Sequence, residues 1–248
     1  MTSFARRRLR VVLTAAVVLI LAGGGALWLR SSSLVRVQDV SVTGIDGRQA
    51  AAIRDALAVA AGRMTTLTVD EDALRDAVAG YPVVRSLRTS TDLPHGLHIT
   101  VNAYDAVAAL TPQNGAPTAV AADGTLLRGT STKDLPLVGV RSVPGGSRLT
   151  DREARHAVEM LGAAPAALRR RVGRVFRGTR GLAATVEGGP KLYFGGGSHL
   201  RAKWSAAAQV LASASARSAS YVDVRIPERP VAGGFEPRLD VSSGSTLG

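Results

Sequence analysis

The sequence contains no cysteine among its 248 residues, and aromatic side chains account for only 4% of it. The lack of cysteine excludes disulfide bonds, thiolate nucleophiles, zinc fingers and iron–sulfur clusters, although it leaves the redox compartment open. The scarcity of aromatic side chains leaves few stacking platforms for single-stranded nucleic acid. The core of the protein must therefore be built mainly from aliphatic side chains.

The overall composition is that of a folded protein. Hydrophobic residues make up 46% and charged residues 20% of the chain, which excludes wholesale disorder and collagen-like repeats. The length corresponds to one or two domains.

The net charge of +12 raises the question of a nucleic-acid or anionic-membrane partner. Its distribution argues against nucleic acid, because the first thirty residues carry five arginines and no acid: Arg6, Arg7, Arg8, Arg10 and Arg30. These arginines flank a long apolar run, so much of the excess charge reflects membrane topology. We predict no nucleic-acid partner.

Residues 11–29 contain no charged side chain, and as a helix they would span about 28 Å, close to the thickness of a bilayer core. Four arginines precede this run, so the positive-inside rule places residues 1–10 in the cytoplasm and the body outside. We predict a type II single-pass protein of the cell membrane. The predicted anchor residues are Val11, Leu13, Val17, Leu19, Leu21, Leu27 and Trp28.

A cleaved signal peptide is the alternative reading of the same segment. Residues 11–21 could serve as a short apolar region, and residues 22–24 are small enough for a cleavage site. The apolar run continues through residues 26–29, which favours the uncleaved anchor. Either reading makes the body of the protein extracytoplasmic.

The pattern after the anchor predicts a strand, two helices and two further strands. Apolar residues alternate over 35–43 and stop at Gly44, and an alanine-rich helical pattern covers 46–61. Asp70 is placed to cap a second helix, whose first turn holds two more acids, and Gly80 ends it. A turn at 93–96 then joins two strands.

This order, with the residues at 81–84 and the hairpin at 93–101, resembles a POTRA domain. A basic tail, one membrane span, one POTRA domain and a β-rich second domain together resemble the FtsQ/DivIB family of bacterial cell-division proteins. The resemblance implies an α+β fold with a transmembrane helix at 11–29, a POTRA domain at 34–104 and a β domain at 105–231. Residues 232–248 are predicted to form a disordered tail.

The second domain carries further patterns of the same kind. An Asp–Gly turn at 123–124 separates two short strands, Thr150 is placed to cap a helix through Leu161, and residues 182–194 read as a hairpin. A helix over 200–216 contains Lys203, whose placement also resembles the family. Two features depart from it: residues 101–108 lack the usual glutamate and proline, and no aromatic precedes the Asp–Gly turn.

Catalytic and metal-binding patterns are weak throughout. His95, His98, His156 and His199 form no triad or metal-ligand spacing, and the acids at 70–72 are better explained as a helix cap and dipole partners. The glycines at 195–197 lack the Gly-Lys-Ser/Thr ending of a phosphate loop. We predict no enzyme activity, no cofactor, no metal and no small-molecule substrate. The arginines between 169 and 180 could meet anionic lipid or wall polymer, or form a solvated face.

The last predicted strand, 221–227, is bounded by prolines and is expected to lie at a sheet edge. A partner segment could add a strand there, although the chain's own tail could instead protect the edge. The family resemblance implies binding of FtsB/FtsL-like coiled-coil division proteins through this region. The predicted partner-binding residues are Tyr221, Val222, Asp223, Val224, Arg225, Ile226 and Pro227.

The function expected from this resemblance is a scaffold that links division proteins at the outer face of the membrane and supports septum assembly. The alternative is an exported or anchored enzyme acting on cell-wall polymers, for which the sequence offers no catalytic constellation. An export chaperone is less consistent, because repeated POTRA units and a long alternating barrel segment are both missing.

Overall fold

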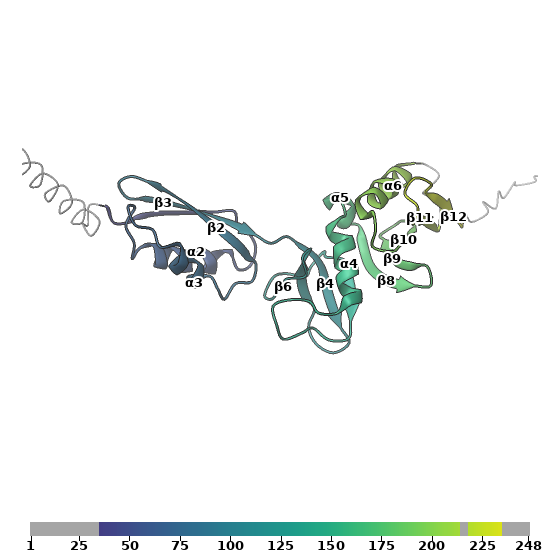
Figure 1. Cartoon of the computed structure of the whole chain (residues 1–248), viewed down its shortest axis with the longest axis horizontal. Coiled ribbons are helices and arrows are strands. Elements are labelled where there is room, and N and C mark those ends of the chain that lie inside the picture. The colour runs from purple at the N-terminus through teal and green to yellow at the C-terminus, as the bar shows by residue number, and fades with distance from the viewer. Residues whose placement is uncertain (1–34, 214–217, 235–248) are drawn as a thin grey trace, which may run out of the picture. The chain divides into compact units, whose positions relative to one another are not determined.

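A computed structural model describes residues 35–213 and 218–234 of the chain (Figure 1). The predicted cytoplasmic tail and the membrane span at 11–29 lie outside these residues, as does the chain beyond 234. None of the helices in the described ranges has both the length and the apolar character needed to cross a membrane. The chain divides into two compact units, with the boundary between Ala103 and Tyr104.

The first unit has the predicted order of strand, helix, helix, strand and strand. Its elements are β1 (Asp39–Thr43), α2 (Ala50–Ala61), α3 (Glu71–Ala77), β2 (Val84–Asp92) and β3 (Gly96–Ala103). The strands form a three-stranded sheet in the order β1-β3-β2, in which β3 runs parallel to β1 and antiparallel to β2.

Alternation along the central strand explains the core of this unit. Leu97, Ile99 and Val101 of β3 point to one face and are buried with residues from both helices, among them Leu57 and Leu74. Burial of these side chains on one face fixes the strand register, because a shift by one residue would expose them all.

The two helices begin for local reasons. Asp70 caps α3 as predicted, because its side chain accepts hydrogen bonds from the backbone N–H groups of Asp72 and Ala73. Helix α2 begins at Ala50 and not at 46 as predicted. Gly47 adopts a φ of +92°, a left-handed conformation that cannot belong to a right-handed helix.

The second unit is built on a nine-stranded sheet in the order β12-β11-β10-β9-β8-β7-β4-β5-β6. Its strands are β4 (Ala106–Pro112), β5 (Thr118–Ala121), β6 (Leu126–Leu127), β7 (Leu137–Val140), β8 (Val172–Gly178), β9 (Gly181–Val186), β10 (Lys191–Gly195), β11 (Tyr221–Asp223) and β12 (Val231–Gly233). Its helices are α4 (Arg152–Gly162), α5 (Ala166–Arg169) and α6 (Leu200–Ala212). The α+β class and the predicted hairpin of β9 and β10 are confirmed.

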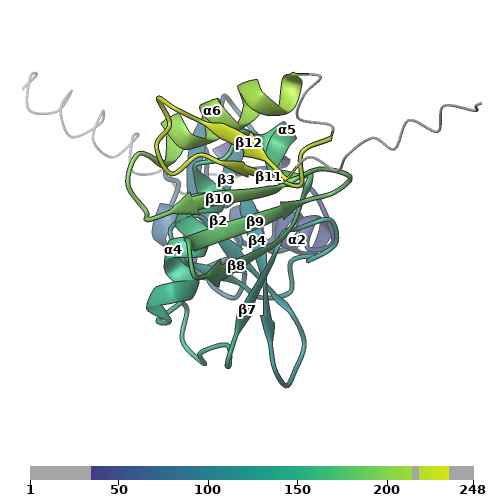
Figure 2. The same cartoon turned by 90° about the vertical axis from the view of Figure 1, so that its right-hand side faces the viewer.

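Helices α4 and α6 both pack against the sheet (Figure 2), and the buried Trp204 of α6 joins them through a hydrogen bond to α4. Trp204 of α6 is fully buried, its ring centroid lies 4.5 Å from that of Phe194, and its Nε1 donates a hydrogen bond 2.7 Å long to the carbonyl of Met160. This bond satisfies the one polar atom of the indole, so the ring can fill the core without a desolvation penalty.

Three predicted boundaries in this unit are wrong. Asp151, not Thr150, caps α4, because the Asp151 carboxylate accepts bonds from the backbone N–H groups of Glu153 and Ala154. Helix α6 ends at Ala212, short of 216. Residues 232 and 233, assigned to the tail, belong to strand β12, because they pair with β11.

The close approach of Gly44 to β3 provides a test of the first unit. Gly44 has a φ of +82°, and a Cβ built on it would lie 2.3 Å from the backbone oxygen of Val101. We expect Gly44→Ala to destabilise this unit by more than the 1–2 kcal/mol, at order of magnitude, that a left-handed alanine costs. Hydrogen–deuterium exchange of the full chain should show faster exchange in β1 and β3, with β9 as internal reference.

Gly47→Ala is the matched control. Gly47 also has a positive φ, of +92°, but nothing lies within 4 Å of the position that a Cβ would take there. This variant bears the backbone strain without the collision. Equal exchange rates in the two variants would contradict the packing role assigned to Gly44.

Candidate protein-binding site

The predicted binding strand is shorter than expected and does not lie at the sheet edge. Strand β11 covers only Tyr221–Asp223 and lies between β10, which is parallel to it, and β12, which is antiparallel. The expectation that residues 221–227 form the edge is therefore wrong. The chain reverses after β11, where the Arg229 N–H donates to the Ile226 carbonyl, and residues 231–233 take the edge position. Residues 221–227 thus form a strand followed by a turn.

The backbone pattern shows which groups of β12 face outward. The N–H of Lys191 donates to the Ser220 carbonyl, and the N–H of Val224 donates to the Tyr193 carbonyl. The backbone groups of successive residues point to opposite sides of a strand, so Ser220 and Val224 use theirs on β10. The N–H and C=O groups of Tyr221 and Asp223 therefore point toward β12, where these residues oppose Gly233 and Val231. The N–H and C=O of Ala232, which lies between these two, therefore face away from the sheet.

The two faces of β11 have different surroundings. Val222 is fully buried in the main core of the unit, as is Val224 just after the strand. Tyr221 lies on the other face, where its ring meets that of Tyr193 edge-on with centroids 5.9 Å apart. The guanidinium carbon of Arg180 lies 5.1 Å from the centroid of Tyr193 and 5.5 Å from that of Tyr221. We call Arg180, Tyr193 and Tyr221 the Tyr–Arg cluster.

The Tyr–Arg cluster also supports the edge strand. A Cβ built on Gly233 would lie 2.5 Å from the Tyr221 hydroxyl oxygen, so the tyrosine ring lies directly over this glycine. A side chain at 233 would displace the ring. Tyr221 thus holds β12 through packing as well as through the strand ladder, which is how an aromatic compensates for a glycine in a sheet.

An ion pair fixes the chain where it leaves β11. The Arg225 guanidinium contacts the Asp223 carboxylate, with Nε 2.9 Å from Oδ2 and Nη2 2.8 Å from the same oxygen. The hydrogen bond to this carboxylate and its negative charge raise the pKa of Arg225. The aliphatic stem of Arg225 lies over Gly195, since a Cβ there would be 2.9 Å from its Cγ. The turn after β11 is thus held against the end of β10.

The edge itself presents apolar side chains to solvent. Ile226 in the turn is 62% exposed and Val231 at the start of β12 is 55% exposed. Within the described residues, β12 has no strand on its outer side. An open strand edge beside exposed apolar side chains is the arrangement used in strand addition.

Lys203 fixes the opposite side of the same region. Its side chain is only 2% exposed, and its Nζ donates to the carbonyls of Phe194, at 2.8 Å, and Gly196, at 2.9 Å. Burial lowers its pKa. The lysine thereby ties α6 to the end of β10, the strand on which β11 is built. In the sequence, only the family resemblance drew attention to Lys203. Its burial depends on the carbonyls of Phe194 and Gly196, which come within hydrogen-bond distance only in the folded chain.

Enzyme-like features are separated in the structure. His95 lies in the turn before β3 with its Nδ1 3.1 Å from the Arg36 carbonyl, whereas His156 lies on α4 and His199 precedes α6. No three His, Asp or Glu side chains in residues 35–213 and 218–234 are grouped closely enough to hold a metal ion. Gly196 serves as an acceptor for Lys203.

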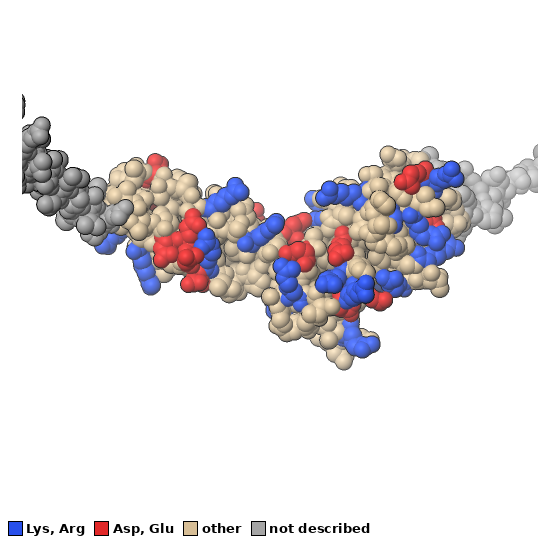
Figure 3. Space-filling view, in the orientation of Figure 1, with Lys and Arg blue, Asp and Glu red and all other residues tan. Residues whose placement is uncertain are grey.

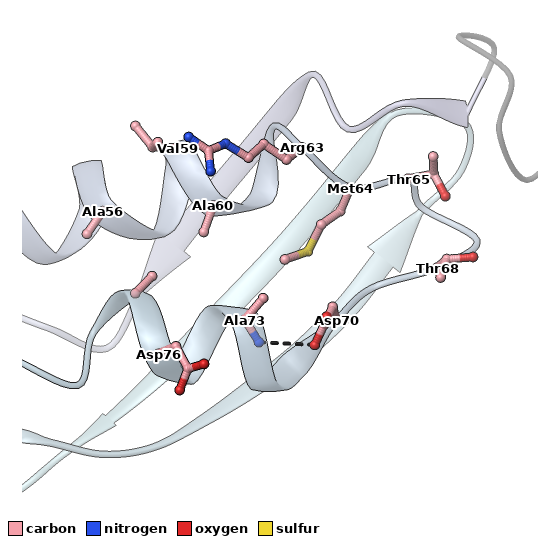
Figure 4. A pocket seen from close by; sticks show the side chains of 11 residues that line it. Ala56, Val59, Ala60, Arg63, Met64, Thr65, Thr68, Asp70, Ala73 and Asp76 are labelled. Carbon is pink, nitrogen blue, oxygen red and sulfur yellow. Dashed lines mark hydrogen bonds between the residues drawn. The ribbon is translucent and has the colours of Figure 1, made fainter.

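The first unit contains a groove of about 840 Å³ between α2 and α3 (Figure 4). Its walls carry small apolar side chains, including Ala56, Ala60 and Ala73, with Arg63 on the α2 side and Asp76 on the α3 side. The space-filling view shows acidic side chains gathered over α3, whereas basic ones spread over the visible face of the second unit (Figure 3). The groove can accept an apolar surface.

Two comparisons with known proteins bear on this arrangement. Residues 35–104, which contain the whole described first unit, match the family model of the FtsQ-type POTRA domain. The cell division protein FtsQ of Streptomyces collinus is 28% identical over 240 residues, covering 92% of this chain and 89% of that protein. The similarity to that protein therefore extends through both units.

The buried lysine leads to a test of the support beneath β11. We expect Lys203→Met to lower the thermal stability of the second unit, because the carbonyls of Phe194 and Gly196 lose their donor, at a cost of about 1–3 kcal/mol. Thermal unfolding of the full chain and hydrogen exchange at β10 measure the effect. Lys191→Met, an exposed change on the same strand, is the control and should leave both unchanged.

The lowered pKa of Lys203 adds a pH signature to this test. The unfolded chain holds this proton up to the ordinary value of 10.5, whereas the folded chain releases it at lower pH. The contribution of Lys203 to stability therefore rises with pH between these two values. An identical pH dependence in Lys203→Met and the natural chain would contradict this assignment.

Proposed function

Because this chain belongs to the FtsQ/DivIB family of bacterial cell-division proteins, we propose that it is a membrane-anchored scaffold that links other division proteins at the outer face of the cytoplasmic membrane. The scaffold would help to assemble a complex of division proteins that supports septum formation. The observation that carries this proposal is the open edge of the nine-stranded sheet at β12, held by the Tyr–Arg cluster and flanked by exposed apolar side chains.

The proposed partners are single-span coiled-coil division proteins of the FtsB/FtsL type. An extended segment of such a partner adds to the outer side of β12, where the backbone N–H and C=O of Ala232 are available to it. Ile226 and Val231 contribute apolar contacts. Backbone bonds provide affinity in this mode, and side chains beside the edge provide specificity.

Residues 221–227 take different parts in this mechanism. Tyr221 packs over Gly233, and the pair of Asp223 and Arg225 holds the turn in which Ile226 is exposed. Val222 and Val224 are buried and act only through the fold. Pro227 lies in the turn that returns the chain to the edge.

The anchor and the POTRA domain place the binding edge beside the membrane and next to other division proteins. Residues 11–29 anchor the body as a single helix with the N-terminus in the cytoplasm, and the FtsQ-type POTRA domain docks to further division proteins. The groove between α2 and α3 offers an apolar surface for that contact. Placement beside the membrane raises the effective concentration of partners that are anchored in the same bilayer.

A proline at the edge tests capture by strand addition. We expect Ala232→Pro to reduce recovery of FtsB/FtsL-like proteins by at least about tenfold, because proline removes the outward N–H that the partner requires. Proline is tolerated at an edge where the N–H faces solvent, so the fold should persist. Affinity purification of the tagged full-length protein from membranes is the measurement.

Ala232→Val retains the backbone N–H and is the matched control for the proline variant. It should recover partners within about twofold of the natural chain, because strand addition uses the main chain. Both variants must show the natural hydrogen-exchange pattern in β9 and β10. Undiminished capture by a correctly folded Ala232→Pro protein would remove the binding site from this edge.

The intact mass of the mature protein tests the anchor. We expect protein from washed membranes to retain residues 1–29, because the apolar run continues past the candidate cleavage site. It should resist alkaline extraction, as a spanning helix does. A mature chain beginning near residue 24 would show a signal peptide and contradict the anchor.

A further inference from the structure

The sheet of the second unit has a second opening, located between β7 and β8. These strands are paired only at Leu137 with Arg174 and at Val138 with Val175. Strand β7 nevertheless continues to Val140, and β8 continues to Gly178. Figure 2 shows the two arrows running apart. In the part of the chain that the structure describes, the facing sides of residues 139–140 and 176–178 therefore have no strand partner.

A cleft of about 1080 Å³ occupies this opening. The last residues of β4, β7 and β8 line it, together with the first residues of α4. The three strands are parallel neighbours, so their carboxyl ends meet at this cleft. The cleft thus combines exposed main chain with side chains from four elements.

Three arginines and two acids are among the residues that line this cleft, and two of the arginines have no acidic partner within the described ranges. Arg141, Arg174 and Arg177 line it. Arg177 lies 3.3 Å from Glu153, but Arg141 and Arg174 contact no acidic side chain among the described residues. The other acid in the cleft, Asp151, is engaged as the cap of α4. Arg141 and Arg174 thus bring to the opening two positive charges without an acidic partner in the part of the chain that the structure describes.

Phe176 adds an apolar contact to this charge. Its side chain is 37% exposed and lines the same cleft. Side chains alternate along a strand, so Arg174 and Phe176 share one face of β8, while Val175 is buried on the other. An exposed aromatic side chain beside arginine is a pairing enriched at protein–protein contacts.

We propose that the cleft between β7 and β8 binds an extended acidic segment of a partner protein, which adds as a strand to the open side of β8. Its main chain pairs with residues 176–178, and its acidic side chains meet Arg141 and Arg174. An apolar side chain of the segment contacts Phe176. A phosphate-bearing polymer could contact the arginines, but it would make no use of the open backbone of β8 or of Phe176. An acidic peptide can contact all three, so it fits this cleft better.

This site is independent of the edge at β12. It uses other strands of the sheet, and Ala232→Pro should leave it intact. The scaffold would then hold two extended segments at once, one at the end of its sheet and one within it.

The test uses a labelled octapeptide of the repeat Glu-Glu-Val-Val, which places glutamate and valine on the same face of an extended chain, and the full-length protein in detergent. We expect saturable binding by fluorescence anisotropy at about 0.15 M salt, and slower hydrogen exchange at residues 176–178 in the complex. The same peptide with N-methylated valines should bind at least about tenfold more weakly, because half of its backbone donors are removed. A lysine–valine peptide should not bind.

Arg141→Glu/Arg174→Glu should weaken binding of the glutamate peptide by at least about tenfold. The control, Arg170→Glu/Arg201→Glu, makes the same charge change at two exposed arginines outside the cleft lining and should bind within about twofold of the natural chain.

Three results would overturn the proposal. One is the absence of saturation up to about 1 mM peptide. Another is equal binding by the double variant and its control. The third is equal binding of the N-methylated peptide together with displacement by inorganic polyphosphate, which would identify a general anion-binding surface.

Discussion

The parallel pairing of β10 with β11 is the constraint on which the binding region depends. Parallel neighbours cannot be joined by a tight turn, so the chain must cross over between them, and here α6 lies in that crossover. Trp204 and Lys203 are adjacent on this helix, and they bind the carbonyls of Met160, Phe194 and Gly196. The position of β11, and of β12 after it, therefore depends on contacts from the helix as well as on the strand's own side chains.

Much of the first unit was predictable because its determinants are local. The alternation along 97–101 and the capping position of Asp70 each act over a few residues, and the structure confirms both. The hairpin of β9 and β10 was predictable for the same reason. The early start assigned to the first helix failed at Gly47, whose left-handed conformation is not visible in an alanine-rich helical pattern.

The binding edge was not predictable from local patterns. Strand β12 has three residues, Val231–Gly233, in a glycine-containing segment without an apolar period, and it becomes a strand only by pairing with β11. The burial of Lys203 requires acceptors that the folded chain brings together. The opening between β7 and β8 depends on the residues at which these two strands stop pairing. Because the strands are far apart in the sequence, no local pattern predicts that point.

The shortness of β12 has a consequence for selectivity. A strand of three residues offers an incoming chain very few main-chain contacts, so sliding by two residues would cost the complex little backbone energy. The alignment of a guest must then come from side chains that fit beside Ile226 and Val231. An edge of this kind selects a partner segment by the spacing of its apolar residues, and a segment with a different spacing dissociates.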